Sequence, residues 1–275
     1  MSLSRAEEEG LVGLVREVAS REILPRFRRL DATEIRAKGR PDDLVTAADL
    51  ASEAALADGI GRVMPGAAVV GEEAVASDPS VLDRLDAPGR VVVVDPIDGT
   101  WNFAHGLATF GVILAVVEDG ETVFGLLYDP VFDDWVLTRR GGGTWMCRAG
   151  EAPVRLQVGP APGLGEAQGF VPLFLFGEAD RDRIAGGMVR TGRAGSLRCS
   201  CHEYRQLVLG GGDFALAAML KPWDHAAGAL ALAEAGGVAA LTDGTAYVPR
   251  LREGHMIAAT GEALRGEVAA VYFGG

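Results

Sequence analysis

The sequence has few cysteines and no long apolar run. Its three cysteines, Cys147, Cys199 and Cys201, lack the spacing of a disulfide framework. We therefore expect buried, reduced thiols and a cytoplasmic protein. No apolar run approaches the roughly 20 residues of a membrane-spanning helix, and residues 1–10 are acidic and polar. We expect neither a membrane span nor a signal peptide.

Positive charge is also scarce. Lys and Arg together number 26 against 38 Asp and Glu, which gives a net charge of −12 and a pI of about 4.8. An acidic chain is repelled by phosphate backbones and anionic lipids, which argues against nucleic-acid or membrane partners. The 275 residues are 48% hydrophobic, as in ordinary globular proteins, and are long enough for one large domain or two small ones.

The most informative segment is Val91–Gly106, with the sequence VVVVDPIDGTWNFAHG. Four valines predict a strand buried on both faces, and the proline and glycine that follow predict that it ends at Asp95. Asp95 and Asp98 repel each other unless a cation lies between them. Thr100 and Asn102 add polar groups where a short helix can begin. The segment therefore predicts a hard cation beside a phosphate.

Periodicity and turn residues predict mixed α and β structure elsewhere. Helices are expected at residues 4–28, 46–64, 178–190, 198–209, 223–235 and from 261. Strands are expected at 67–71, 111–118, 122–128, 135–138, 144–148, 167–171 and 255–259, with a polar connection at 77–89. Composition changes near residue 150, so we expect an N-terminal metal-binding α+β half over residues 1–150 and a C-terminal α/β half over 151–275 that completes the active site.

The motif D-P-I-D-G-T-x-N-F-x-H-G resembles the signature of the inositol monophosphatase superfamily of Mg-dependent, lithium-sensitive phosphatases. Asp43–Asp49, Gly71–Glu73 and Trp223–Gly237 agree with further family motifs, in the family's order. The resemblance covers essentially the whole chain. It implies an α+β fold, a layered α/β/α/β/α sandwich of the inositol monophosphatase and fructose-1,6-bisphosphatase type, and a homodimer.

The resemblance also implies the activity, which is hydrolysis of a small phosphate monoester by a metal-activated water, with two or three Mg²⁺ ions. Mg²⁺ prefers oxygen ligands and lowers the pKa of bound water. The implied ligands are Glu72, Asp95, the carbonyl of Ile97, Asp98 and Asp224.

Other roles follow from the same resemblance. Thr100 and Asp49 position the attacking water, because a carboxylate orients and polarises a hydroxyl that is a weak base alone. Glu72 is counted with them as catalytic, and Lys38 helps to screen the metal cluster. The expected substrate-binding residues are Asp98, Gly99, Thr100, Arg198 and Asp224. Glu73 is expected to face away from Glu72, as neighbours at a strand end do, and the four histidines to be structural.

The leaving-group side departs from inositol phosphatases, which carry a Glu seven residues before the aspartate of the Trp-Asp motif. Counted without gaps, that position is Ala217, and the family's small Gly-Thr or Gly-Ser pair falls on Arg198-Cys199. A gapped register uses Gly195-Ser196 instead. In the ungapped register the pocket loses a carboxylate and gains a guanidinium, with Lys221 nearby. That change suits a leaving group with its own negative charge.

Several functions stay open at this point. Inositol monophosphate is the family's default substrate, and histidinol phosphate, fructose 1,6-bisphosphate and 3′-phosphoadenosine 5′-phosphate are alternatives. A non-enzyme alternative is a regulatory scaffold that binds metal and phosphate. Such a scaffold has no need of the water-positioning pair, Thr100 and Asp49, beside all the carboxylates.

Overall fold

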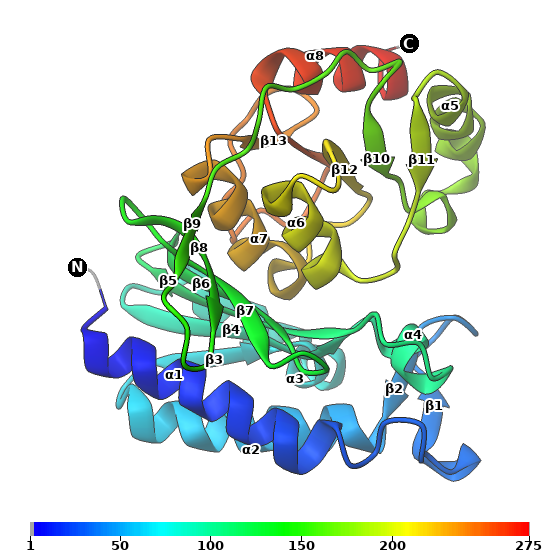
Figure 1. Cartoon of the computed structure of the whole chain (residues 1–275). Coiled ribbons are helices and arrows are strands. Elements are labelled where there is room, and N and C mark those ends of the chain that lie inside the picture. Colours follow the sequence, from blue (N-terminus) through cyan, green and yellow to red (C-terminus); the bar gives the residue numbers. More distant parts are fainter. Residues whose placement is uncertain (1–2, 275) are drawn as a thin grey trace.

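The computed structural model describes residues 3–274, which form five layers (Figure 1). Two helices cover the outer face of a seven-stranded sheet, two lie between this sheet and a five-stranded sheet, and two cover the outer face of the second sheet. From bottom to top in Figure 1, these helices are α1 (Arg5–Val18) and α2 (Ala47–Val63), α6 (Ser200–Leu209) and α7 (Pro222–Glu234), and α5 (Glu178–Val189) and α8 (Glu262–Tyr272). The α+β fold with α/β/α/β/α layering is confirmed.

The seven-stranded sheet follows the chain order from β3 to β9. Its first pair is parallel, and all the other neighbours are antiparallel. The strands are β3 (Ala68–Gly71), β4 (Arg90–Asp98), β5 (Gly111–Glu118), β6 (Glu121–Asp129), β7 (Asp134–Arg139), β8 (Gly143–Arg148) and β9 (Val154–Leu156). A separate hairpin is formed by β1 (Ile35–Ala37) and β2 (Leu44–Thr46). The division of the chain into halves at residue 150 stays a prediction.

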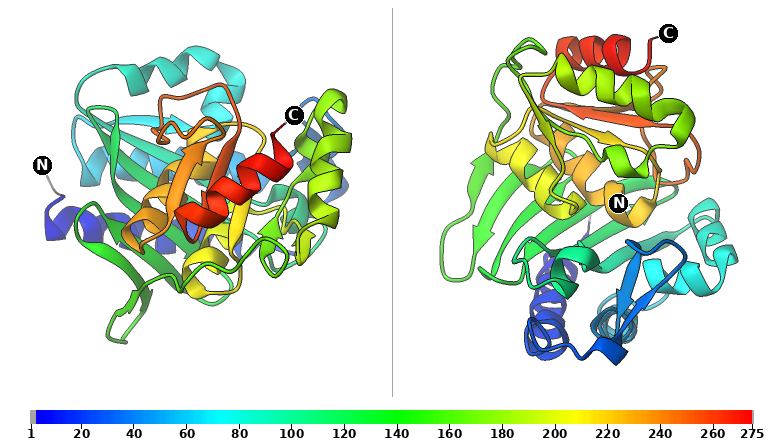
Figure 2. Two further views of the ribbon diagram at one scale, coloured as in Figure 1. Left: turned by 90° about the horizontal axis from the view of Figure 1, so that it is seen from above. Right: turned by 90° about the vertical axis from the view of Figure 1, so that its right-hand side faces the viewer.

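The five-stranded sheet has the order β11-β10-β12-β14-β13. Strand β10 pairs in parallel with both of its neighbours, and the other pairs are antiparallel. The strands are β10 (Gln168–Phe170), β11 (Arg193–Gly195), β12 (Phe214–Ala217), β13 (Val238–Leu241) and β14 (Met256–Ala259). Figure 2 shows this sheet beneath α5 and α8, with α6 and α7 on its inner face.

The sequence analysis does not predict the short strands β1, β2, β9, β11, β12 and β13, and several predicted elements have different ends in the structure. Strand β4 does not end at Asp95 but continues to Asp98, through an irregularity in its pairing with β5. The first helix is α-helical only to Val18 and then becomes a π-helical turn, Ala19–Ile23. The expected polar connection contains a 3₁₀ helix, Pro79–Asp86. The short helices α3 (Glu72–Ser77) and α4 (Thr100–Ala104) begin at the two acidic motifs.

Small residues bring α7 close to the first sheet and to α6. A Cβ on Gly125 of β6 would lie 3.0 Å from the Ala227 backbone, and a Cβ on Gly228 would lie 2.1 Å from the Tyr204 ring. The backbone of α7 therefore lies in close contact with β6, and the buried alanines of α7 belong to the core between the two sheets. This packing fixes the first turn of α7, which carries Asp224. Within residues 3–274, no helix is long and apolar enough to cross a bilayer.

Candidate active site

Several element ends meet around a cavity of about 170 Å³. They are the end of β4 and the first turns of α3, α4, α6 and α7. The cavity is lined by polar groups from these turns and by an apolar wall of Pro172, Phe174, Leu175 and Met219. Its charged lining residues are Asp42, Asp43, Glu72, Asp95, Asp98, Arg198, Glu203, Lys221 and Asp224.

Three carboxylates gather on one side of the cavity. Asp95, Asp98 and Asp224 each offer an oxygen within 4.8 Å of the others. Burial raises the pKa of Asp95 well above its usual value, and the charge of Glu72 raises it further. Burial likewise raises the pKa of Asp98 and brings that of Asp224 to about 8. The nearby charge of Lys221 lowers the pKa of Asp224 but does not outweigh burial and the neighbouring carboxylates, so this donor set fits a hard divalent cation.

The sequence predicts that Glu72 and Glu73 face opposite ways at a strand end, and this prediction is wrong. They begin α3, and the Nζ of Lys38 lies 2.9 Å from Glu72 Oε1 and 2.5 Å from Glu73 Oε1. In a helical turn, neighbouring side chains differ by about 100° rather than 180°, which lets one lysine reach both. Burial would raise the pKa of Glu72, but Lys38 and then Lys221 lower it overall. Lys38 thus lies beside the carboxylates, where the sequence predicts it.

Thr100 and Asp49 lie in contact, although 51 residues separate them. The Thr100 hydroxyl lies 3.1 Å from Asp49 Oδ1 and 3.0 Å from the Ile97 carbonyl. Thr46, the N-cap of α2, donates both its N–H and its hydroxyl to Asp49 Oδ2. Burial raises the pKa of Asp49 to about 6 despite these bonds from Thr46. Asp49 is therefore held with one oxygen directed at Thr100.

Gly99 shapes the start of α4. Its φ of 86° lies in the left-handed region, which glycine adopts without strain. A Cβ there would lie 3.0 Å from the Thr109 carbonyl and 3.2 Å from Cys199 Cβ. The first N–H groups of a helix lack intrahelical partners. The N–H groups of Gly99 and Thr100 are therefore suited to an anion.

Asn102 fastens this turn to two distant loops. Its Nδ2 donates to the Thr109 carbonyl and to the Leu197 carbonyl, both at 2.8 Å. The sequence places an amide in the signature, but Leu197 is 95 residues away, so no local pattern indicates this partner. Asn102 thus links the signature turn to the segment that carries Arg198.

Arg198 is not the first residue of α6 as predicted, because that helix begins at Ser200. Its φ of 53° lies in the left-handed region, where the ungapped register expects the family's glycine. The guanidinium lies between two rings, 4.2 Å from the centroid of Trp101 and 4.6 Å from that of Phe174. Asp42 lies 3.7 Å from it. The conformation of Arg198 supports the ungapped register, and Ala217 also lines the cavity.

Ser196, from the gapped register, also lines the cavity but is engaged within its own loop. Its hydroxyl donates to Glu203 at 2.9 Å and accepts from the Arg198 N–H at 3.0 Å. Glu203 also accepts from the Leu197 N–H. Burial raises the pKa of Glu203 to about 7. The sequence analysis did not identify Glu203, which stabilises the loop that carries Arg198 by accepting hydrogen bonds from Ser196 and Leu197.

Two further groups complete the surroundings. Burial would lower the pKa of Lys221, but Asp224 and Glu72 raise it overall, so this lysine stays charged beside the carboxylates. Each histidine ring contacts a backbone carbonyl, as expected for structural residues. The pairs are His105 with Trp101, His202 with Phe110, His225 with Met219 and His255 with Ala218.

Comparison with known proteins gives one family. The family model described as "Inositol monophosphatase family" matches residues 6–272. The chain is 30% identical to inositol-1-monophosphatase of Bacillus subtilis over 79% of each chain. It is 31% identical to histidinol-phosphatase of Mycobacterium tuberculosis over 79% of this chain and 82% of that one. A solved inositol monophosphatase from Zymomonas mobilis superposes with a TM-score of 0.79 at 26% identity, covering 98% of this chain and 99% of that chain.

Proposed function

Since the chain belongs to the inositol monophosphatase family and is a phosphoric monoester hydrolase, we propose that it hydrolyses a small phosphate monoester with the help of Mg²⁺. The observation that carries this proposal is the approach of Asp95, Asp98 and Asp224 to within 4.8 Å, beside the Thr100–Asp49 pair. A metal-binding scaffold without activity would require the three carboxylates but not the Thr100–Asp49 pair.

Glu72, Asp95, Asp98, Asp224 and the Ile97 carbonyl would hold two or three ions. When bound, Mg²⁺ neutralises the phosphate, lowers the pKa of the attacking water and stabilises the leaving alkoxide. Lys38 and Lys221 offset the remaining negative charge around Glu72. They therefore limit the repulsion that an incoming phosphate dianion meets.

The protein's own groups position the reactants. Thr100 donates its hydroxyl proton toward Asp49, which leaves an oxygen lone pair to accept a hydrogen bond from the attacking water. The N–H groups of Gly99 and Thr100 bind phosphate oxygens at the start of α4. Water and phosphate are thus fixed in position by one turn of chain.

The leaving group is proposed to carry negative charge of its own. Arg198 lies where the ungapped register places a family glycine, and Ala217 where it places the hydroxyl-binding Glu. Arg40 and Arg198 both contact Asp42, so the three side chains bear a net positive charge. This favours fructose 1,6-bisphosphate or 3′-phosphoadenosine 5′-phosphate over histidinol phosphate, whose leaving group is cationic, and over inositol monophosphate.

A substrate panel tests the proposal directly. Phosphate release would be measured with and without Mg²⁺ on the four candidate esters, and kcat/KM compared. We expect activity only with Mg²⁺ and the highest kcat/KM on a doubly phosphorylated compound. If none of the four esters releases phosphate in a Mg²⁺-dependent way, the scaffold alternative is favoured. A clear preference for inositol monophosphate would instead refute the assigned leaving-group site.

The family resemblance supports three further proposals, namely inhibition by Li⁺, a homodimeric state and a cytoplasmic location. The first is tested by titrating Li⁺ to tens of millimolar in the same assay. The second is tested by light scattering of the purified protein, and the third by cell fractionation.

A further inference from the structure

We propose that Cys199 is a positioning residue, whose thiol fixes the carboxylate of Asp98 so that one chosen oxygen faces the metal. The proposal rests on the proposed function of Asp98 as a ligand. The Cys199 Sγ lies 3.1 Å from Asp98 Oδ2 and 3.6 Å from the Asp98 carbonyl. Only 2% of Cys199 is exposed, so no solvent molecule takes the place of the thiol.

A second donor engages the same oxygen. The N–H of Cys201 donates to Asp98 Oδ2 from the first turn of α6. A carboxylate oxygen offers two lone pairs, and on Oδ2 the Cys199 thiol and the Cys201 N–H occupy both. The Ser200 N–H is a further hydrogen-bond partner of the Asp98 carboxylate. Oδ2 is therefore saturated, which leaves Oδ1 as the oxygen that binds a cation. The carboxylate of Asp98 is thus held in one orientation, in which Oδ1 would face a bound cation.

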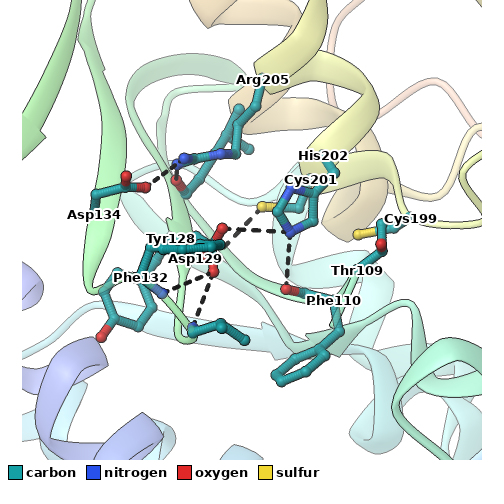
Figure 3. A network of polar contacts seen from close by, with 12 residues as sticks. Thr109, Phe110, Tyr128, Asp129, Phe132, Asp134, Cys199, Cys201, His202 and Arg205 are labelled. Atoms are coloured by element: carbon teal, nitrogen blue, oxygen red, sulfur yellow. Dashed lines mark hydrogen bonds and ion pairs between the residues drawn. The ribbon is translucent and has the colours of Figure 1, made fainter. Parts of the chain in front are cut away.

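The donors are held in place by the contacts of α6, shown in Figure 3. Arg205 pairs with Asp134 of β7 and donates to the Leu127 carbonyl at 3.0 Å. His202 Nε2 lies 3.0 Å from the Phe110 carbonyl. A Cβ on Gly111 would lie 2.5 Å from Cys201 Sγ, so the start of α6 lies directly on β5. A helix anchored at these points presents a rigid N-terminus to Asp98.

This inference gives position 199 a role different from the one that the ungapped register implies. In that register Cys199 belongs to the pair beside the leaving group. Its thiol instead contacts the side chain of Asp98, while Arg198 faces the rings of Trp101 and Phe174. The two neighbouring residues therefore have different roles. Cys199 orients the metal ligand Asp98, and Arg198 binds the leaving group of the substrate.

Two variants of equal shape isolate the donor. Cys199→Thr keeps a hydrogen-bond donor, and Cys199→Val replaces it with a methyl group. Residue 199 has an extended backbone, φ −160° and ψ 102°, which β-branched residues adopt readily. Cys147→Val, at a buried thiol outside the cavity, is the control for loss of a thiol as such.

Mn²⁺ binding to each purified protein would be measured by calorimetry without substrate, together with its melting temperature. We expect Cys199→Val to weaken the Mn²⁺ Kd by about 10-fold or more, the usual effect of removing a partner of a metal ligand. Cys199→Thr and Cys147→Val should stay within about threefold of wild type. A merely structural role would change the melting temperatures and leave the affinities alike.

The outcomes separate two failures. If wild-type protein binds no Mn²⁺, the metal-dependent function itself is wrong. If wild type binds Mn²⁺ and the Val and Thr variants bind it equally, the positioning role is overturned. Should Cys199→Val fail to fold, the Thr variant decides, because a tenfold loss of affinity in Cys199→Thr also contradicts the proposal.

Discussion

Two of the polar side chains in the proposed site, those of Thr100 and Arg198, depend on neighbouring residues for their position. Thr46 holds Asp49, and Asp49 in turn orients the hydroxyl of Thr100. Glu203 holds the loop of Arg198 through Ser196. Substitution of a residue that contacts the reactants should therefore change the kinetics directly. Substitution of a residue that only positions another should act mainly through the stability of the local structure.

Thr100→Ala should lower kcat by about 10²- to 10⁴-fold, the usual contribution of a positioned proton acceptor. Mn²⁺ affinity should change little, because the hydroxyl is not among the proposed ligands. Thr100→Ser, which keeps the hydroxyl, is the control and should retain most of the activity. The assay is steady-state phosphate release at saturating Mg²⁺. If Thr100→Ala loses metal binding but regains its rate at high Mg²⁺, Thr100 serves ligation instead.

Arg198→Gly should reduce kcat/KM on a doubly phosphorylated substrate by about 10- to 150-fold, the worth of a charged hydrogen bond. On a singly phosphorylated polyol the loss should stay below about threefold. Arg198→Ala should show the same kinetics but a lower melting temperature than Arg198→Gly, because only glycine adopts φ 53° without strain. Equal kinetic losses on both substrates would remove Arg198 from the leaving-group site.

At the scale of elements, helix α6 carries a buried charge near its N-terminus. Burial raises the pKa of Glu203, which belongs to this helix, to about 7 in the folded protein, above its ordinary value of 4.5. Below about pH 4.5 both the folded and unfolded states hold the proton, and between pH 4.5 and 7 only the folded state does. The free energy of unfolding therefore falls as the pH rises through this window.

Glu203→Gln removes this titration while keeping an acceptor for Ser196 and Leu197. As the pH rises from 5 to 8, the melting temperature of the variant should increase relative to that of wild type. The corresponding free-energy difference should reach up to about 3 kcal/mol. Thermal melts of both proteins across this pH range provide the measurement. A difference that stays constant with pH would show that Glu203 does not titrate in the window.

The long elements can be predicted from sequence because their signals are local. The Val91–Val94 run, the Asp119-Gly120 turn and the Ala-rich α2 each carry their own periodicity or turn chemistry. Strands β11 and β12, of three and four residues, are not among the strands predicted from the sequence. Their identity comes from pairing with β10, which no local pattern records.

The candidate site divides in the same way. The acidic motifs are contiguous and chemically distinctive, so Asp95, Asp98 and Asp224 are found from sequence and meet in the structure. The rings around Arg198 come from segments far apart in the chain, at Trp101 and Phe174. Their association depends on how the two sheets are stacked, which the sequence pattern does not specify.

At the scale of the whole molecule, the proposed metal ligands join separate layers. Asp95 and Asp98 end a strand of the first sheet, and Asp224 begins a helix between the two sheets. Carboxylates from two layers repel each other until a cation lies between them. A bound ion would therefore stabilise the packing of the layers as well as the site.

Mg²⁺ should thus raise the melting temperature of the protein. Ligand binding to the folded state alone stabilises it by about 2.7 kcal/mol at 100 times the Kd. The measurement is a thermal melt in chelator and in rising Mg²⁺, with K⁺ at equal ionic strength as the control. An increase that K⁺ reproduces would show general screening of the acidic chain rather than a specific site.

The central claim is that buried carboxylates bind the ions on which hydrolysis depends, and Asp95→Asn tests it most directly. Asp95 is buried beside Glu72, Asp98 and Asp224, and a neutral amide cannot supply its charge to a cation. Phosphate release at saturating Mg²⁺ would be compared between wild type and variant, with a thermal melt of each. We predict a folded protein with less than about a hundredth of the wild-type rate, since removing a metal's main charge partner forfeits several kcal/mol of transition-state stabilisation. A folded variant that keeps more than about a tenth of that rate, a loss below about 1.4 kcal/mol, would contradict the account.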